Sequence, residues 1–163
     1  MYDARQVANC LLDLSDERGV PITHLALQKI VYFSHGNAYA RFGKPLLLNK
    51  IEAWKKGPVV RELYFAFNTF GDRPISGRAE IVNFQSRRRE KIGYNFPPEI
   101  MDHLRETLEI YGPIDPWRLV AMTHEAGSPW KQVIDGAEKK ANAGMHIDES
   151  LIREFFCRTA SQN

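Results

Sequence analysis

The stretch IEAWKKGPVVRELY, residues 51–64, decides how the surrounding chain folds. It joins a short extended run to a Gly57-Pro58 junction and then to a helical pattern. Gly57 relieves the restriction that a following proline imposes on the backbone, and Pro58 suits the first helical position, where no N–H is needed. Apolar residues then recur at helical spacing as far as Gly71, which suits a helix end. The pattern predicts a strand-to-helix corner and one helix from Pro58 to Phe70.

Length and composition indicate a single domain. The 163 residues are 44% apolar and 11% aromatic, which is enough for one substantial core and too short for two independent ones. The helical and extended patterns predict a compact, mainly α-helical α+β fold, with about six helices and a small sheet of two or three short strands. We expect the domain to cover residues 1–158 and the tail, residues 159–163, to fray.

The predicted helices are marked by capping residues and by prolines at their starts. Asp3, Thr23 and Asp148 are placed to cap helices, while Pro116 and Pro129 suit the positions where helices begin. Besides residues 58–70, the expected helical segments are 4–18, 25–42, 100–111, 117–124, a short one over 130–134, and a last one from 149 to about 158.

The segments between the helices carry further predictions. Residues 46–54 have an extended pattern, and Ile75 and residues 79–84 have the pattern of short strands between turn residues. Residues 87–91, RRREK, form a basic run that is more typical of a solvated loop than of a contact with phosphates or with an acidic protein face. Residues 136–145 are small and polar, which predicts a flexible loop.

The segment 25–42 is predicted to lie in the middle of the fold. Its apolar residues cover most of the helix circumference rather than one stripe. Polar residues at spacings of three or four form a seam along this helix: Gln28, Lys29, Tyr32 and His35. Long polar side chains are seldom buried without a partner. The seam therefore either makes hydrogen bonds within the core or faces a ligand or a protein partner, and the sequence favours neither.

Charge and cysteine content limit the classes of partner and compartment. The 22 basic and 20 acidic residues leave a formal net charge of +2, which is too balanced to indicate a nucleic-acid or membrane partner. Cys10 and Cys157 lie in apolar helical patterns and are expected to be buried free thiols. No run approaches the length of a membrane span, and residues 1–18 show no apolar signal core. We therefore expect a soluble cytoplasmic protein.

Motifs for catalysis are absent from the sequence. The five histidines have no metal-ligand spacing, and no nucleophile elbow, zinc-protease or phosphate-loop pattern occurs. His124 beside Glu125 is the nearest approach to an acid/base pair, but adjacent helix residues point in different directions. We therefore expect no catalytic residue, no metal and no cofactor, and hence no enzyme.

Large aromatic side chains are the remaining candidates for a binding surface. Such residues are enriched in protein interfaces, although core packing is the more common role for any single one. The candidates are Trp54, Trp117, Trp130, Tyr32, Tyr64 and Tyr111.

Four stretches, in this order, carry a recognisable family pattern. They are LALQKIVYF (25–33), IEAWKKGPVV (51–60), THEAGSPW (123–130) and the closing helix over 147–156. Together they span essentially the whole chain, and they resemble the Panacea domain family, the family of SocA-like antitoxins and phage-associated GepA proteins. Two positions depart from the family pattern: Lys56 replaces an aromatic residue before the glycine, and Phe33 replaces a second tyrosine.

The resemblance implies that the chain is the antitoxin of a type II toxin–antitoxin pair and neutralises a co-encoded protein toxin by direct contact. Because the SocA-like branch is associated with delivering its toxin to a Clp-type protease, a proteolytic adaptor is the alternative. A small-ligand-binding or hydrolytic enzyme with a pocket under Trp54 and His124 is a third hypothesis. We expect no membrane partner, and no nucleic-acid partner without a fused DNA-binding segment; the oligomeric state stays open.

The resemblance also implies which residues bind the partner. They are Gln28, Lys29, Tyr32, Trp54, Gly57, Pro58, Val59, Tyr64, Thr123, His124, Pro129 and Trp130. A motif shared by relatives with different partners equally marks the scaffold. In that case a loop such as 87–91 or 136–145 selects the toxin.

Overall fold

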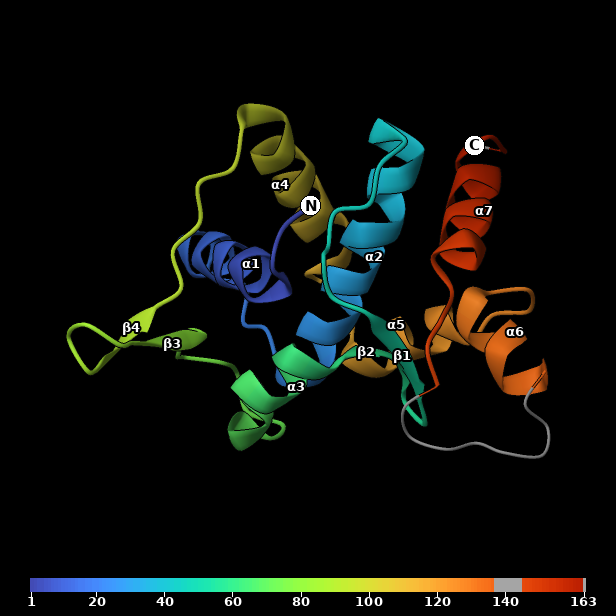
Figure 1. Ribbon diagram of the computed structural model, residues 1–163. Coiled ribbons are helices and arrows are strands. Elements are labelled where there is room, and N and C mark those ends of the chain that lie inside the picture. The colour runs from blue at the N-terminus through green and yellow to red at the C-terminus, as the bar shows by residue number, and fades with distance from the viewer. Residues whose placement is uncertain (137–144, 163) are drawn as a thin grey trace.

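The computed structural model describes residues 1–136 and 145–162, which form seven α-helices, one 3-10 helix and four β-strands (Figure 1). The helices are α1 (Ala4–Arg18), α2 (His24–Phe42), α3 (Arg61–Phe67), η1 (Asn68–Phe70), α4 (Pro98–Tyr111), α5 (Pro116–Thr123), α6 (Pro129–Gly136) and α7 (Glu149–Ala160), and the strands are β1 (Ile51–Trp54), β2 (Gly57–Val60), β3 (Glu80–Asn83) and β4 (Arg88–Lys91). The mainly helical α+β class is confirmed, with two separate two-stranded sheets in place of one among these residues. Most of the loop expected over 136–145 lies outside the described residues.

Helix α2 runs through the centre of the molecule, as its apolar circumference predicts (Figure 1). It packs against α1, α4, α5, α7 and β2, and most of its residues are buried. Thr23 caps its start by accepting a hydrogen bond from the backbone N–H of Ala26 at 3.3 Å. Gly43 ends the helix in the left-handed conformation, at a φ of 66°. The polar seam of α2, residues Gln28, Lys29, Tyr32 and His35, is therefore buried in the core.

The Gly57-Pro58 junction lies in a β-hairpin, so the predicted helix start at Pro58 is wrong. Strands β1 and β2 pair antiparallel around a turn at Lys55 and Lys56, and Pro58 stands opposite Ala53. Proline is tolerated at this position because the opposite residue, Ala53, directs its own N–H away from β2 to Met145 O, so Pro58 is not needed as a donor to β1.

Helix α3 begins only at Arg61, and η1 continues it from Asn68 to Phe70. The side chain of Gln28 on α2 holds the preceding residue extended. Its Oε1 accepts a hydrogen bond from Val60 N at 2.9 Å, and its Nε2 donates to Val60 O at 3.1 Å. The helical pattern therefore does form a helix from Arg61 onward. The contact between Gln28 of α2 and Val60 keeps the residues before Arg61 in strand β2.

A segment just before α7 lines the other edge of β1. The backbone N–H of Ala53 donates to Met145 O, and that of Ile147 donates to Ile51 O, both at 2.8 Å. These bonds tie the first hairpin to the chain that leads into α7.

The second hairpin, β3 with β4, projects from the helical body (Figure 1). Two predictions are wrong here: residues 88–91 of the basic run form strand β4 rather than a loop, and Ile75 lies outside the strands of the described residues. Strand β4 pairs antiparallel with β3, with Lys91 opposite Glu80, so backbone pairing with a neighbouring strand turns the basic run into a strand. Ile75 is fixed by a hydrogen bond from its N–H to Ile22 O at 2.9 Å.

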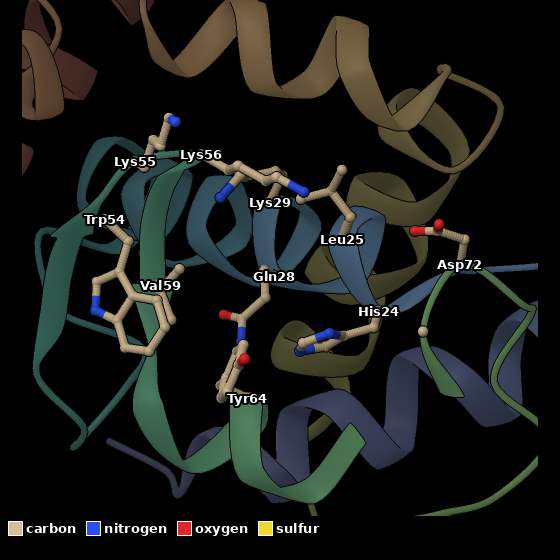
Figure 2. A pocket seen from close by; sticks show the side chains of 11 residues that line it. His24, Leu25, Gln28, Lys29, Trp54, Lys55, Lys56, Val59, Tyr64 and Asp72 are labelled. Carbon is tan, nitrogen blue, oxygen red and sulfur yellow. The ribbon is translucent and has the colours of Figure 1, made fainter. Parts of the chain in front are cut away.

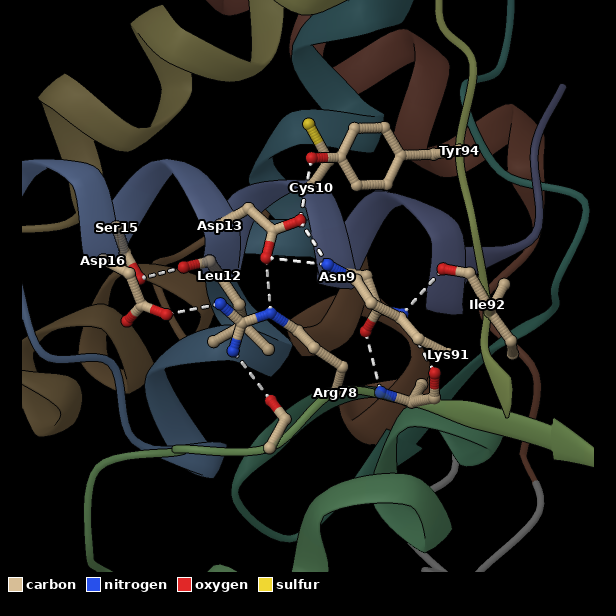
Figure 3. Close-up of polar contacts among 12 residues, drawn as sticks. Asn9, Cys10, Leu12, Asp13, Ser15, Asp16, Arg78, Lys91, Ile92 and Tyr94 are labelled. Atoms are coloured by element: carbon tan, nitrogen blue, oxygen red, sulfur yellow. Dashed lines mark hydrogen bonds and ion pairs between the residues drawn. The ribbon is translucent and has the colours of Figure 1, made fainter. Parts of the chain in front are cut away.

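The Asn9 side chain of α1 anchors the base of the second hairpin (Figure 3). This buried amide donates to the carbonyls of Ala79 and Ile92 at 3.0 and 2.9 Å. Its oxygen accepts from Ala79 N at 2.8 Å. The amide thus satisfies backbone groups on both sides of the hairpin, which buried polar groups require.

The Asp13 carboxylate forms a second anchor on α1 (Figure 3). It accepts hydrogen bonds from Arg78 Nε at 2.7 Å, from Lys91 Nζ at 2.7 Å and from the Tyr94 hydroxyl at 2.9 Å. Burial raises the pKa of Asp13, but these donors outweigh burial and hold the pKa below its usual value. The carboxylate therefore stays charged where it clamps the hairpin.

The two cysteines are both free, as predicted. Cys10 is fully buried, and burial raises its pKa to about 11, so it stays a protonated thiol. Cys157 is only partly buried, which corrects the prediction for that residue. Among the described residues, no helix combines the length and the apolar character that crossing a bilayer requires.

Candidate functional site

Three of the motifs singled out in the sequence meet at Gly57. This glycine has a φ of 95°, in the left-handed region that other residues rarely adopt. A Cβ atom placed there would lie 2.6 Å from Thr123 Oγ1 and 3.1 Å from Lys29 Nζ. Glycine is therefore required both by the hairpin backbone and by the close approach of α2 and α5.

Lys29 is the residue of α2 that reaches this meeting point. Its side chain is fully buried, and its Nζ donates to the carbonyl of Pro58 at 2.7 Å. No carboxylate of the described chain lies within 4.0 Å of this amine. Burial lowers the pKa of Lys29 to about 7, because a charge removed from water is poorly stabilised by one neutral partner.

Two other members of the polar seam are satisfied within the core. Gln28 binds both backbone groups of Val60. His35 accepts a hydrogen bond from the Leu47 N–H at 3.1 Å and contacts the Glu149 carboxylate at 2.9 Å. For Gln28 and His35 the structure therefore favours hydrogen bonding within the core over contact with a ligand or a protein partner.

The motif 123–130 packs beneath the first hairpin. Trp130 donates its indole N–H to Trp54 O at 2.8 Å, and its ring stacks on His124 with the centroids 3.6 Å apart. Burial, and then the positive charge of Lys29, lower the pKa of His124. The stacked imidazole is therefore neutral near pH 7 and belongs to the packing of the hairpin.

A pocket of about 360 Å³ opens between α2 and the first hairpin (Figure 2). Its lining is mostly apolar, with the rings of Trp54 and Tyr64 tilted toward each other at a centroid distance of 4.9 Å. His24 and Tyr64 lie below the Lys29 side chain in Figure 2, and Asp72 stands at the opposite end from Trp54. The pocket is thus a small aromatic recess next to a buried amine.

The turn of the first hairpin carries exposed charge beside an exposed indole. Trp117 on α5 is 58% exposed, and Lys56 Nζ lies 4.9 Å from the centroid of its ring, within the range of a cation–π contact. Lys55 is exposed next to it. Lys55, Lys56 and Trp117 together form the hairpin-tip surface.

Most of the predicted partner-binding residues lie inside this assembly rather than on its surface. The buried ones are Gln28, Lys29, Tyr32, Gly57, Pro58, Val59, Thr123, Pro129 and Trp130, and the partly exposed ones are Trp54, Tyr64 and His124. All of them belong to the hairpin or to the elements packed on it. Tyr32 of α2, however, packs edge-on against Phe156 of α7, with ring centroids 5.6 Å apart. The buried residues hold the scaffold, and contact of any of these residues with a partner stays a prediction.

Six residues of the pocket were not among the predicted site residues: His24, Leu25, Lys55, Lys56, Gly71 and Asp72. His24 stands one helical turn before Gln28, so helical spacing is a signal that could have identified it. The two lysines lie inside the motif, but their exposure follows from a hairpin turn, where the sequence pattern predicts a helix start.

The residues expected to come nearest to an acid/base pair do not form one in the described structure. His124 Nε2 has no hydrogen-bond partner there, and Glu125 is exposed. No group of three His, Cys, Asp or Glu residues in the same part of the chain lies close enough to hold a metal ion. What the site offers is therefore shape, aromatic surface and positive charge.

Comparison with known proteins agrees with the pattern of motifs. The family described as Antitoxin SocA-like, Panacea domain, matches residues 27–131. Antitoxin SocA of Caulobacter vibrioides (strain NA1000 / CB15N) is 34% identical over 154 residues, which cover 94% of this chain and 82% of that relative. No solved structure matches the chain.

Proposed function

The chain belongs to the family of SocA-like antitoxins with a Panacea domain, and from this membership we propose that it is the antitoxin of a toxin–antitoxin pair. The observation that carries the proposal is its 34% identity to Antitoxin SocA over 94% of the chain. The protein binds a co-encoded toxin in the cytoplasm and neutralises it by direct contact, without chemistry of its own.

We assign the toxin contact to the hairpin-tip surface. Tryptophan is enriched among the residues that dominate binding energy in interfaces, and Trp117 offers an indole that is 58% exposed. The lysines of the turn add a charge that suits an acidic face on the toxin. The buried motif residues support this surface from beneath, since Gly57, Lys29 and Thr123 fix the hairpin against α2 and α5.

Co-expression with the product of the adjacent gene tests this function. The neighbouring protein alone should arrest growth, and this chain should restore growth and co-purify with it. Rescue without a complex would contradict neutralisation by direct contact. Rescue that is lost in a strain lacking Clp proteases would replace that mechanism with delivery of the toxin to a protease.

Surface variants test the assigned contact. Trp117→Ala should weaken the complex at least about tenfold, because truncating a hot-spot residue costs about 2 kcal/mol or more. Leu48→Ala is the matched control, because Leu48 is similarly exposed, at 62%, but lies outside the hairpin-tip surface. Phe84→Ala on the second hairpin, where the side chain is 91% exposed, tests the competing idea that the region of residues 87–91 selects the toxin.

A further inference from the structure

The aromatic pocket between α2 and the first hairpin carries more positive charge than the described part of the chain neutralises. Lys29 lines it from α2, and Lys55 and Lys56 line it from the turn. Among its described lining residues Asp72 is the one acid, and it forms no ion pair with any of these lysines within 4.0 Å. The pocket therefore has a positive field and apolar walls.

Lys29 in particular has unused capacity for hydrogen bonding. A lysine ammonium has three N–H donors, and within the described residues the Pro58 carbonyl accepts one of them, at 2.7 Å. The side chain is fully buried, and an ammonium in such a place gains strongly from an opposite charge. A backbone contact holds the amine in place, and residues 1–136 and 145–162 supply no counter-ion for its charge.

His24 adds a second unsatisfied polar group beside the same recess. Its Nε2 is buried without a hydrogen-bond partner among the described residues. Its ring lies 5.4 Å from that of Tyr64, centroid to centroid, and faces the pocket in Figure 2. Burial, and then the charge of Lys29, lower the pKa of this imidazole. It is therefore neutral near pH 7 and able to donate or accept one hydrogen bond.

We propose that this pocket binds a carboxylate carried on a flat apolar framework, with the Lys29 ammonium as its counter-charge. The aromatic rings of Trp54 and Tyr64 enclose the framework, and His24 supplies a further polar contact. The volume of about 360 Å³ lies within the range of small-molecule sites. The carboxylate comes either from a free small aromatic acid or from an acidic side chain of the toxin that enters beside an aromatic one, and the site itself does not depend on the proposed antitoxin function.

Binding at this site takes up a proton. Because burial lowers the pKa of Lys29 to about 7, much of the amine is neutral above that pH, and a bound carboxylate favours the charged form. Affinity therefore falls as pH rises. The charged and titratable groups that line the pocket or act on its charge are His24 from α2, Lys55 and Lys56 from the turn, Tyr64 from α3 and Asp72 after η1. His124, at the end of α5, lies close enough to Lys29 for the charge of the amine to lower its pKa, and Lys131 of α6 acts on His124 in the same way.

Phenylacetate is the probe for the isolated protein, and phenylacetamide is its uncharged match. Binding is followed by titration calorimetry and by the NMR signal of the Trp54 indole N–H. At about pH 6, phenylacetate should saturate the site at millimolar concentration or below and bind at least about tenfold more tightly than the amide. At about pH 8 its affinity should drop roughly fivefold or more, with uptake of a proton seen in buffers of different ionisation heat.

Lys29→Met tests the counter-charge directly, and Lys44→Met on the exposed loop after α2 is the matched control. The first variant should lose about tenfold in affinity for phenylacetate while binding phenylacetamide as before, and the second should behave as the unmodified protein. If Lys29→Met fails to fold, two measurements on the unmodified protein still test the proposal: the affinity for phenylacetate relative to phenylacetamide, and the pH dependence of phenylacetate binding.

A competition experiment separates the two sources of the carboxylate. If phenylacetate displaces the product of the adjacent gene from its complex with this chain, an acidic side chain of the toxin occupies the pocket. If phenylacetate binds without displacement, the site serves a free acid. The proposal is overturned if phenylacetate shows no saturable binding up to about 10 mM, if the amide binds equally well, or if a folded Lys29→Met variant binds the acid unchanged.

Discussion

Replacing Gly57 with alanine should destabilise the protein far more than the same change at another left-handed glycine. Two costs act at this position. The backbone must keep a φ of 95°, which costs a residue with a Cβ about 1–2 kcal/mol. The new methyl group would also lie 2.6 Å from Thr123 Oγ1 and 3.1 Å from Lys29 Nζ, and such overpacking costs about 1–3 kcal/mol. The sum is about 2–5 kcal/mol.

Urea unfolding of matched variants separates the two costs. Gly43→Ala is the control, because Gly43 has a φ of 66° but no atom of the described residues within 4 Å of the position that a methyl group would take. This variant should therefore show only the cost of the left-handed backbone. Thr123→Ala combined with Gly57→Ala should cost about 1 kcal/mol less than the two single changes together, since it removes the atom that clashes. Equal losses for Gly57→Ala and Gly43→Ala, or strict additivity with Thr123→Ala, would refute this explanation of the junction.

Three further predictions concern the contacts around α1, α2 and α6. Asp13→Asn should lower the free energy of unfolding by about 1–3 kcal/mol near neutral pH. Because the pKa of Asp13 is lowered in the folded state, its stabilising effect is present above about pH 4 and is lost as the pH falls. Urea unfolding at a series of acidic pH values will measure this loss. The pKa of Lys29 is about 7 in the folded state, below its usual value, so the unfolded chain binds more protons than the folded one. The free energy of unfolding should therefore rise by about 2 kcal/mol from pH 7 to pH 9. Lys29→Met should abolish that rise. Trp130→Phe should cost about 1 kcal/mol in urea unfolding, because the Trp54 carbonyl loses its donor, and unchanged stability would mean that this bond contributes nothing.

The helices could be predicted from the sequence because their ends carry their own signals. Asp3, Thr23 and Asp148 cap α1, α2 and α7 as expected, each with a side chain that accepts a hydrogen bond from the first helical turn. Gly19 and Gly43 end the first two helices in the left-handed conformation. These are local effects, so the residues that cause them stand next to the boundaries they set.

The first hairpin could not be predicted in the same way. A proline after a glycine fits both a helix start and a strand edge, and the local pattern does not separate them. The deciding contact is between Gln28 and Val60, which lie 32 positions apart. Likewise the basic run 87–91 has the composition of a loop and becomes β4 only because β3 pairs with it.

For the candidate site, the sequence indicated which segments come together but not which side chains face solvent. The motifs that contain Lys29, Gly57 and Thr123 do meet, yet all three residues are buried. The exposed group beside them, Trp117, was one aromatic candidate among several, and its exposure depends on how α5 packs against the hairpin turn. Periodicity gives the face of a helix, whereas exposure depends on elements that are distant in sequence.

The most direct test of the proposed function is the affinity of the purified chain for the product of the adjacent gene. We expect a stable complex that Trp117→Ala weakens at least about tenfold, while Leu48→Ala leaves its affinity within about twofold. A chain that protects cells but forms no complex with that protein, or a complex as strong with folded Trp117→Ala as without the change, would contradict neutralisation through the hairpin-tip surface.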